Sequence, residues 1–291
     1  MKKIGKKKLF LIELAVVLVL FFLWQKHSSS EREKTVMPEN SIELHIIDVG
    51  QGDSILVRTE SGNLLIDAGP GDSEEKLADY LDGLGIESFE YCIFTHPHED
   101  HIGGADMIMR NYEVKNVIMS GAVTDTKTFS NLLYALEESE ANVIEASPDR
   151  TYKIGELEIL IMGPCVVGKS RDLNNSSVIA RLTYGDVRML FTGDAESVEE
   201  SDVLKEYSAY DLDCDFLKLG HHGSSTSSSE AFINAVTPAF AAISCGVDNS
   251  YGHPHRETLS MLEGNGIEYE RTDKHGDIVY QCDGKNFEIK N

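Results

Sequence analysis

Apolar residues occur in the first part of the chain in short runs of strand length. Three runs, at 42–49, 54–59 and 64–67, are separated by the Gly-containing segments GQG and SGN, which is typical of consecutive strands in a meander. Leu and Tyr then recur at helical spacing over 74–84, and this stretch stops at Gly85, as expected of a helix. A further apolar run at 91–95 predicts another buried strand.

The same alternation continues through the rest of the chain. The pattern predicts helices at 129–138, 198–207, 229–236 and 257–264. It predicts strands at 142–145, 151–162, 177–184, 187–192, 215–219, 240–244, 277–281 and 287–290. Two successive halves, each with strands followed by strand–helix units, predict an α/β fold in which two sheets lie face to face with helices outside.

The first 40 residues differ in character from this body. Residues 1–8 are basic, and an apolar run broken by Glu13 follows over 9–25. The sixteen residues from Leu9 to Trp24 would span about 24 Å as a helix, somewhat less than the roughly 30 Å hydrocarbon layer. The basic flank predicts a cytoplasmic end, a single-pass membrane anchor and an extracytoplasmic body. A cleaved signal segment and a secreted body are the alternative. Residues 26–40 are interpreted as a linker, so the folded domain is expected at 41–291.

Composition and charge limit the possible functions. The 291 residues contain 26 Lys and Arg against 49 Asp and Glu, for a net charge of −23, and 41% are hydrophobic. This composition excludes a disordered tail, a collagen-like fibre and a polytopic membrane protein. Because phosphate neutralisation requires Lys and Arg, so acidic a body argues against long duplex DNA as a partner. The sequence points to no protein partner.

The most informative motif is HPHEDH at residues 96–101, directly after a predicted strand. Three imidazoles and two carboxylates in six residues are costly to hold together unless a cation binds them. His96 and His98 can converge on one ion, and Asp100 and His101 can face a second. A surface cluster of histidines is the alternative when this motif is taken alone.

Other predicted strands also end in side chains that can bind metals. Asp67 ends one strand and can accept a hydrogen bond from a liganding histidine. Asp194 follows the strand at 187–192, and His221 and His222 follow the strand at 215–219. A site whose residues lie at the ends of several strands is held precisely, because the strands form a rigid scaffold.

These motifs resemble the metallo-β-lactamase superfamily, whose signature is H-x-H-x-D-H with a preceding D-x-G, a later Gly-Asp and a later His. More narrowly, DVGQGDS at 48–54, GHHGS at 220–224 and YGHPH at 251–255 resemble the soluble hydrolase domain of the competence DNA-internalisation protein ComEC. The resemblance covers residues 41–291. It implies a four-layer αβ/βα sandwich, with a dinuclear metal site at one edge of the two sheets.

The resemblance also implies roles for the candidate ligands. His96 and His98 would hold the first ion, Asp100, His101 and His221 the second, and Asp194 would bridge the two. Two Zn²⁺ ions are expected. Many relatives place a histidine where this chain has Asn174 and Asn175, so the first site is expected to be weaker, and Mn²⁺ is an alternative to Zn²⁺.

The remaining candidates surround this metal site. We favour His221 over His222 as ligand because it comes first after its strand. His222 and Ser224 would then face the substrate. His253 and His255 are candidates for acid to a leaving group or for a spare ligand, with exposed loop histidines as the alternative. Catalytic roles are assigned to Asp100, Asp194, His222 and His253, and substrate binding to Asn175, Ser224 and His255. Asp53 is interpreted as bonding to its own backbone at a tight turn.

The expected reaction is metal-assisted hydrolysis, in which a water is activated by two cations. The resemblance favours a phosphodiester substrate, either nucleic acid or a phosphate-bearing cell-wall or choline ester. Hydrolysis of small esters, lactones or β-lactams is one alternative. A membrane-tethered binding module of the same fold without turnover is another.

Overall fold

The computed structural model describes residues 37–166 and 172–290. The expectations for the basic end, the apolar run and residues 26–36 of the linker therefore lie outside the described residues. Within the described ranges, no helix is both long and apolar enough to cross a lipid bilayer.

The strands of the described chain form two mixed sheets. The larger sheet has the order β15-β14-β1-β2-β3-β4-β5-β6, antiparallel from β15 to β3 and parallel from β3 to β6. Its strands are β1 (Ile42–Ile46), β2 (Ile55–Thr59), β3 (Gly62–Ile66), β4 (Ser88–Phe94), β5 (Glu113–Met119), β6 (Asn142–Glu145), β14 (Ile278–Cys282) and β15 (Phe287–Lys290).

The smaller sheet has the order β13-β12-β11-β10-β9-β8-β7. Strands β10 to β13 run parallel, and β7 to β10 pair in antiparallel fashion. Its strands are β7 (Thr151–Ile154), β8 (Leu157–Gly163), β9 (Ile179–Tyr184), β10 (Val187–Phe191), β11 (Phe216–Lys218), β12 (Phe240–Ile243) and β13 (Glu268–Arg271).

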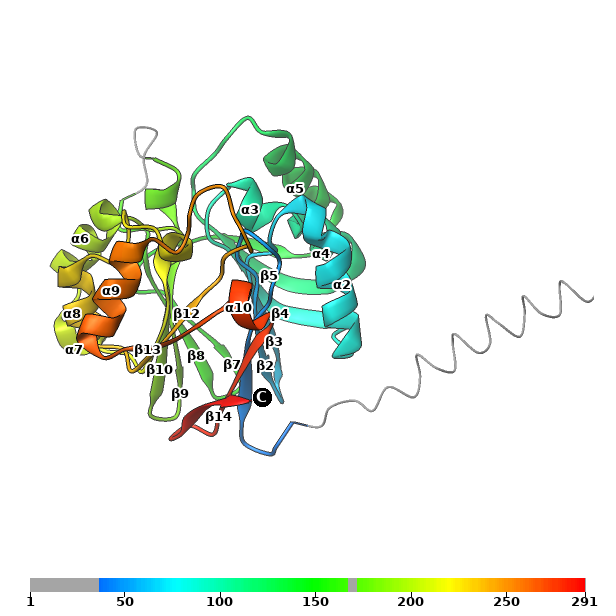
Figure 1. Cartoon of the computed structure of the whole chain (residues 1–291). Helices are drawn as coiled ribbons and strands as arrows, with labels where there is room; N and C mark the ends of the chain where they lie inside the picture. The colour runs from blue at the N-terminus through cyan, green and yellow to red at the C-terminus, as the bar shows by residue number, and fades with distance from the viewer. Residues whose placement is uncertain (1–36, 167–171, 291) are drawn as a thin grey trace, which may run out of the picture.

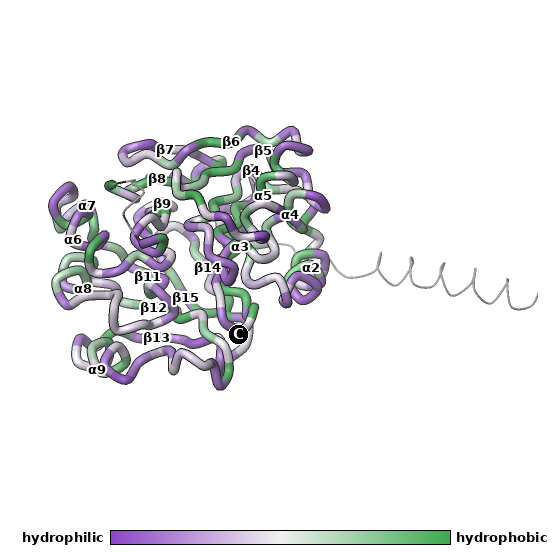
Figure 2. The backbone as a smooth tube through the Cα atoms, turned by 90° about the horizontal axis from the view of Figure 1, so that it is seen from above, coloured by the Kyte–Doolittle hydropathy of each residue, from purple (hydrophilic) through white to green (hydrophobic). Residues whose placement is uncertain are grey.

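Helices cover the outer face of each sheet (Figure 1). The larger sheet is covered by α2 (Glu74–Gly83), α4 (Ala105–Asn111) and α5 (Lys127–Glu138), and the smaller one by α6 (Ser197–Glu206), α8 (Glu230–Val236) and α9 (Arg256–Asn265). Seen from above, the two helical layers flank the strands on opposite sides (Figure 2). The short helices are α3 (Glu99–Ile102), α7 (Ala209–Leu212), α10 (Thr272–His275), η1 (Gly71–Ser73), η2 (Asn174–Ser176) and η3 (Gly220–Gly223).

The alternation of side chains along the strands explains these four layers. In β1, Ile42, Leu44 and Ile46 enter the core between the sheets, whereas Ile47 just beyond the strand packs on the helix side. Phe216 of β11 joins the same central core from the other sheet. Since burying a large aliphatic side chain contributes about 1.5–3 kcal/mol, a slip by one residue would be strongly destabilising. The predicted four-layer αβ/βα sandwich is confirmed.

The structure adds elements that the hydrophobic pattern did not predict. The N-terminal half of β5 alternates exposed polar residues with Val114, and the edge strand β13 has no fully buried residue. β13 is held by backbone pairing to β12. β5 pairs with β4 and also buries Val117 and Ile118 in the core, but its polar first half obscures the strand pattern. The single strand predicted at 151–162 is instead a hairpin, β7 and β8, which turns at Gly155 with a φ of 56°.

Candidate metal centre

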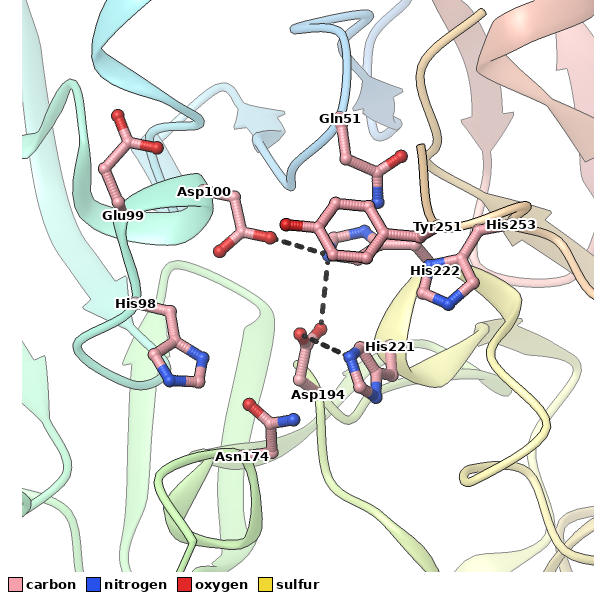
Figure 3. Close-up of a pocket in the computed structure, with 10 residues that line it drawn as sticks. All are labelled: Gln51, His98, Glu99, Asp100, Asn174, Asp194, His221, His222, Tyr251 and His253. Atoms are coloured by element: carbon pink, nitrogen blue, oxygen red, sulfur yellow. Dashed lines mark ion pairs between the residues drawn. The ribbon is translucent and has the colours of Figure 1, made fainter. Parts of the chain in front are cut away.

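The predicted metal residues meet at the edge of the sandwich where loops from both sheets approach each other. The larger sheet supplies the loops after β1, β3 and β4, and the smaller one supplies the loops after β10, β11 and β12. They surround a pocket of about 370 Å³. Figure 3 shows the side chains that line it: Gln51, His98, Glu99, Asp100, Asn174, Asp194, His221, His222, Tyr251 and His253.

Two glycines allow these loops to come this close. A Cβ atom on Gly103 would lie 2.1 Å from the backbone nitrogen of Gly71, so only glycine lets the end of α3 contact the loop after β3. A Cβ atom on Gly52 would lie 2.3 Å from the carbonyl oxygen of Asp100. The neighbouring Asp53 N–H donates to that same oxygen at 3.1 Å. The DVGQGDS loop therefore packs against the HPHEDH segment and is hydrogen-bonded to it.

Four side chains form a compact group of potential ligands. Asp100, His101, Asp194 and His222 each offer one ligand atom, and these atoms all lie within 4.8 Å of one another. His222 Nε2 is 3.3 Å from Asp100 Oδ2 and 3.6 Å from Asp194 Oδ1. His101 Nε2 is 3.2 Å from the same Asp194 oxygen. We call these four residues the ligand quartet.

The quartet has the chemistry of a cation site. His101 Nε2, His222 Nε2 and Asp194 Oδ1 are all buried and have no hydrogen-bond partner in the part of the chain that the structure describes. Buried polar atoms are nearly always paired, and imidazole nitrogens beside carboxylate oxygens are the donor set preferred by Zn²⁺ and similar divalent metals. The quartet therefore fits a divalent metal ion.

Asp67 holds the His101 ring from behind, in the position that the sequence predicted. His101 Nδ1 lies 2.7 Å from Asp67 Oδ2, and both residues are fully buried. Thr95 fixes the carboxylate in turn, through its N–H at 2.8 Å and its hydroxyl at 2.7 Å. With a proton on Nδ1 directed at Asp67, the Nε2 lone pair of His101 is directed toward Asp194.

His96 and His98 form a second pair of imidazoles beside the quartet. The ring centroids of His96 and His101 are 4.2 Å apart. His96 Nε2 lies 2.9 Å from His98 Nδ1 and 3.9 Å from Asp194 Oδ2. The two Asp194 oxygens therefore face different groups of donors, Oδ1 toward the quartet and Oδ2 toward His96.

The structure differs from the sequence analysis over which histidine of GHHGS joins the quartet. His222 is 1% exposed and belongs to it, whereas His221 lies at the pocket wall, with Nε2 3.7 Å from Asp194 Oδ2 and Nδ1 3.4 Å from Glu196 Oε1. Both residues have left-handed backbones, with φ of 50° and 54°. With both residues in this conformation, His222 faces the quartet, whereas His221, the first of the two along the chain, faces the other oxygen of Asp194 and Glu196.

The two asparagines after β8 also have separate positions. Asn175 Oδ1 accepts from the N–H groups of Glu196 and Glu199, both at 3.2 Å, so its amide caps the start of α6 rather than facing substrate. Asn174 lines the pocket, and its buried Oδ1 has no hydrogen-bond partner among the described residues. The neutral amide available to the site is therefore that of Asn174.

Two of the predicted substrate-binding residues are engaged in the loop itself. The Ser224 hydroxyl lies 3.0 Å from that of Thr226 and accepts from the Thr226 N–H. His255 Nδ1 accepts from the Ser225 N–H at 2.9 Å, and its Nε2 faces the Tyr251 carbonyl oxygen at 3.3 Å. Neither Ser224 nor His255 belongs to the pocket lining described above.

His253 is the residue of the YGHPH motif that does reach the pocket. Its ring stacks between those of His222 and Tyr251, with centroid separations of 6.2 and 5.6 Å. Its Nδ1 is buried without a hydrogen-bond partner in the described chain. Burial and the neighbouring His222 and His221 lower the pKa of His253 to about 4, so its imidazole is neutral near pH 7.

The electrostatics of the quartet call for positive charge. Burial opposes protonation of His222, but the Asp194 and Asp53 carboxylates raise its pKa to about 10. Burial also opposes protonation of His101, yet Asp194 and Asp67 hold its pKa well above the usual value. The Asp194 pKa is held well below its usual value by these imidazoles, against the effect of burial. Either protons on the two rings or a bound cation supplies the required charge.

Sequence reasoning assigned no role to Gln51 and Lys218 at this site. Gln51 Oε1 accepts from the Gly246 N–H at 3.1 Å, and the rest of its amide faces the pocket (Figure 3). Lys218 Nζ donates to Asp53 Oδ2 at 2.8 Å. The Asp53 side chain therefore bonds to a lysine of the other sheet and not to its own backbone as predicted. The position of Gln51 within DVGQGDS was the available signal for its role.

Comparison with known proteins agrees with this geometry. The chain is 33% identical over 258 residues to ComE operon protein 3 of Bacillus subtilis and 29% identical over 245 residues to Competence protein ComA of Neisseria gonorrhoeae. These matches cover 82% and 84% of this chain but only 33% of each relative, so the chain spans about a third of the length of these relatives.

A solved structure shows the same fold, and a family signature shows the family. The metallo-β-lactamase fold protein YhfI from Bacillus subtilis superposes with a TM-score of 0.57 at 15% identity, covering 83% of this chain and all of YhfI. Residues 47–247 match the family described as the Metallo-beta-lactamase superfamily. The chain therefore belongs to the metallo-β-lactamase superfamily, within which it is similar to ComEC-like proteins.

Proposed function

We propose that this chain is a metal-dependent hydrolase of phosphodiester bonds. The observation that carries the proposal is the convergence of three buried, unpartnered ligand atoms, those of His101, His222 and Asp194. Without a cation, such an arrangement leaves several desolvated polar atoms unsatisfied, each of which costs about 1–3 kcal/mol. A protein of this fold that only bound other macromolecules would be destabilised by these unsatisfied atoms without any gain in function.

The side chains suggest how two ions would be held. The quartet would bind one, and His96, His98 and the second oxygen of Asp194 would bind the other, with the Asn174 amide as a neutral neighbour. Zn²⁺ suits this set of donors, and the share of oxygen donors makes Mn²⁺ a competitor. Bound there, such ions supply a water of lowered pKa and stabilise charge on a phosphoryl oxygen.

The protein's own residues would bind and orient the substrate. Gln51 has its amide oxygen engaged by Gly246, so its NH₂ group is left to donate to a phosphoryl oxygen in the pocket. His253 is neutral near pH 7 and unpaired at Nδ1, so it would accept a proton from the attacking water rather than donate one to the leaving group. Asp100, which is half-buried and beside His222, is placed to orient the attacking water.

The substrate class is proposed from charge and shape together. A net charge of −23 repels long duplex DNA, but a single phosphodiester at a strand end approaches the cationic centre alone. Tyr251, 65% exposed at the pocket mouth, offers a ring on which a base can stack.

The test is a comparison of substrates on the full chain loaded with Zn²⁺ or Mn²⁺. A generic aryl phosphodiester, single-stranded DNA and glycerophosphocholine are assayed beside a lactone and a β-lactam, with Asp194→Ala as the inactive control. We expect the phosphodiesters to be cleaved faster than the lactone and the β-lactam, and single-stranded DNA faster than glycerophosphocholine. Preferential lactone or β-lactam hydrolysis would reassign the substrate, and no metal-dependent turnover of any of them would favour the binding module.

We also propose that residues 9–25 place the domain at a membrane, with the hydrolase domain on the extracytoplasmic side. The proposal rests on the basic residues 1–8 that precede this apolar run. Protease added to intact cells should then degrade the domain. Complete protection of the domain would contradict this topology, and recovery of a shortened chain from the medium would indicate cleavage and secretion.

A further inference from the structure

Asp53 and Lys218 form a buried ion pair directly behind the metal centre. Each side chain is 1% exposed, and Lys218 Nζ lies 2.8 Å from Asp53 Oδ2. Asp53 comes from the loop between β1 and β2, whereas Lys218 ends β11 in the other sheet. A buried ion pair is weak support for stability, because desolvation offsets most of the attraction between the charges. Its position therefore calls for another explanation.

The second oxygen of Asp53 faces a residue of the ligand quartet. Asp53 Oδ1 is buried, has no hydrogen-bond partner within the described ranges, and lies 3.3 Å from His222 Nδ1. The Ser244 carbonyl oxygen lies 3.0 Å from the same nitrogen. A carbonyl can only accept, so His222 Nδ1 carries the proton and donates it to the Ser244 oxygen. The Asp53 carboxylate lies behind the same N–H as a nearby negative charge.

The arrangement repeats on the other side of Asp194. His101 has the Asp67 carboxylate behind Nδ1 and Asp194 in front of Nε2. His222 has the Asp53 carboxylate behind Nδ1 and the same Asp194 oxygen in front of Nε2. Carboxylates behind liganding imidazoles orient the ring and raise its basicity. Asp53 differs from Asp67 in having a lysine to hold it.

Lys218 restrains both the carboxylate and the chain that leads to His222. Besides Asp53, its ammonium donates to the Leu219 carbonyl oxygen at 3.1 Å. Leu219 immediately precedes η3, the left-handed turn that carries His222. One buried charge therefore restrains the backbone before the histidine and the carboxylate behind its ring.

We propose that Asp53 and Lys218 are a positioning pair that fixes the His222 ring toward the metal, although neither residue lies in the ligand quartet. The inference rests on the metal site of the proposed function. It implies that the affinity for metal depends on a contact between the two sheets. Carboxylates behind the ring of a liganding histidine typically contribute about 10–100-fold in metal affinity.

Removing both charges together separates positioning from support of the fold. Asp53→Ala alone would leave the Lys218 charge buried and unpaired, and the fold itself would suffer. The double variant Asp53→Ala/Lys218→Met removes the pair without leaving either charge behind. We expect it to fold and to bind Zn²⁺ about 10–100-fold more weakly than the native chain in a competition titration. Asp53→Asn/Lys218→Met, which restores an acceptor oxygen, should recover part of the loss.

A matched control tests whether any buried carboxylate has the same effect. Glu43 is 1% exposed and paired with Arg58 at 2.7 Å and with Lys290 at 2.5 Å, but it makes no contact with the quartet. Glu43→Gln should lower the melting temperature and leave the affinity for Zn²⁺ unchanged. An equal loss of affinity in this control would show that the effect is general destabilisation, which would overturn the proposal.

A second measurement does not depend on metal or activity. The Nδ1–H proton of His222, assigned by its disappearance in His222→Ala, should exchange slowly with solvent in the metal-free native chain and faster in Asp53→Ala/Lys218→Met. If the native chain binds no divalent ion, the proposed function fails, and this exchange rate alone decides the role of Asp53. Native metal affinity together with native exchange in the double variant would show that Ser244 suffices, and would overturn the inference.

Discussion

At the scale of single residues, the metal centre depends on how two consecutive histidines are turned. The sequence predicted the HPHEDH ligands, Asp67 and Asp194 as neighbours, because each follows a strand, and the structure brings them together. It favoured His221 over His222 as ligand, because the left-handed backbone at both positions is not visible in the residue types. The same applies to Asn174 and Asn175, where capping of α6 decides which amide faces the pocket.

The two histidines should therefore differ when each is truncated. His222→Ala removes a buried ligand of the quartet and should weaken metal binding by at least about tenfold. Losing only the hydrogen-bond partner behind a liganding histidine already lowers metal affinity by about 10–100-fold. His221→Ala removes a side chain at the pocket wall and should change metal affinity by less. Isothermal titration with Zn²⁺ on both variants measures the difference. Equal losses, or a larger loss for His221→Ala, would restore the ligand assignment favoured by the sequence.

Metal affinity should also depend on pH in a defined direction. The pKa of His222 is raised to about 10 and that of His101 lies well above its usual value, so both rings must lose a proton before Nε2 can bind a cation. Affinity is therefore highest at high pH and falls as pH decreases, by about tenfold per pH unit for each proton released. Calorimetric titrations with Zn²⁺ between pH 6 and 8, repeated in buffers of different ionisation enthalpy, measure how many protons are released on binding. Affinity that is constant over this range would contradict the assignment.

At the scale of elements, the start of α6 links the fold to the pocket. Asn175 accepts two backbone N–H groups there, those of Glu196 and Glu199, while the preceding Asn174 faces the pocket. Hydrophobic patterning predicted this helix and most of the strands. It did not predict β5, whose polar first half precedes a buried second half, or β13, which is held mainly by backbone pairing. It also did not show which end of a helix a polar side chain would cap.

Asn175→Ala should consequently be a stability variant. Asn175 accepts from the N–H groups at the start of α6 in the way an N-cap side chain does, and loss of such a side chain costs about 0.5–2 kcal/mol. The urea midpoint of the variant should therefore fall while its metal affinity stays near native. Asn174→Ala is the matched neighbour and should show the reverse, with a native midpoint and altered metal binding or turnover. If Asn175→Ala lost metal without losing stability, the amide of Asn175 would belong to the site after all.

At the scale of the whole molecule, the metal centre is a junction between two sheets. Asp67, Asp100 and His101 come from the larger sheet, whereas Asp194 and His222 come from the smaller one, and the Asp53–Lys218 pair crosses the same boundary. The order of strands and helices, together with the family motifs, predicted this sandwich and its site at one edge. Contacts between side chains more than a hundred residues apart, such as Asp53 with Lys218, had no signal in local sequence.

The most direct test of this account is the metal content of the native chain and of Asp194→Ala after both are dialysed against a limiting amount of Zn²⁺ or Mn²⁺. Asp194 Oδ1 faces His101 of the quartet and Asp194 Oδ2 faces His96. Removing Asp194 should therefore weaken metal binding both at the quartet and at the His96–His98 pair. We expect about two ions per native chain, as in dinuclear hydrolase sites, and fewer than about one in a folded Asp194→Ala variant. A native chain that retains no metal, or a variant that retains as much as the native chain, would contradict the central claim.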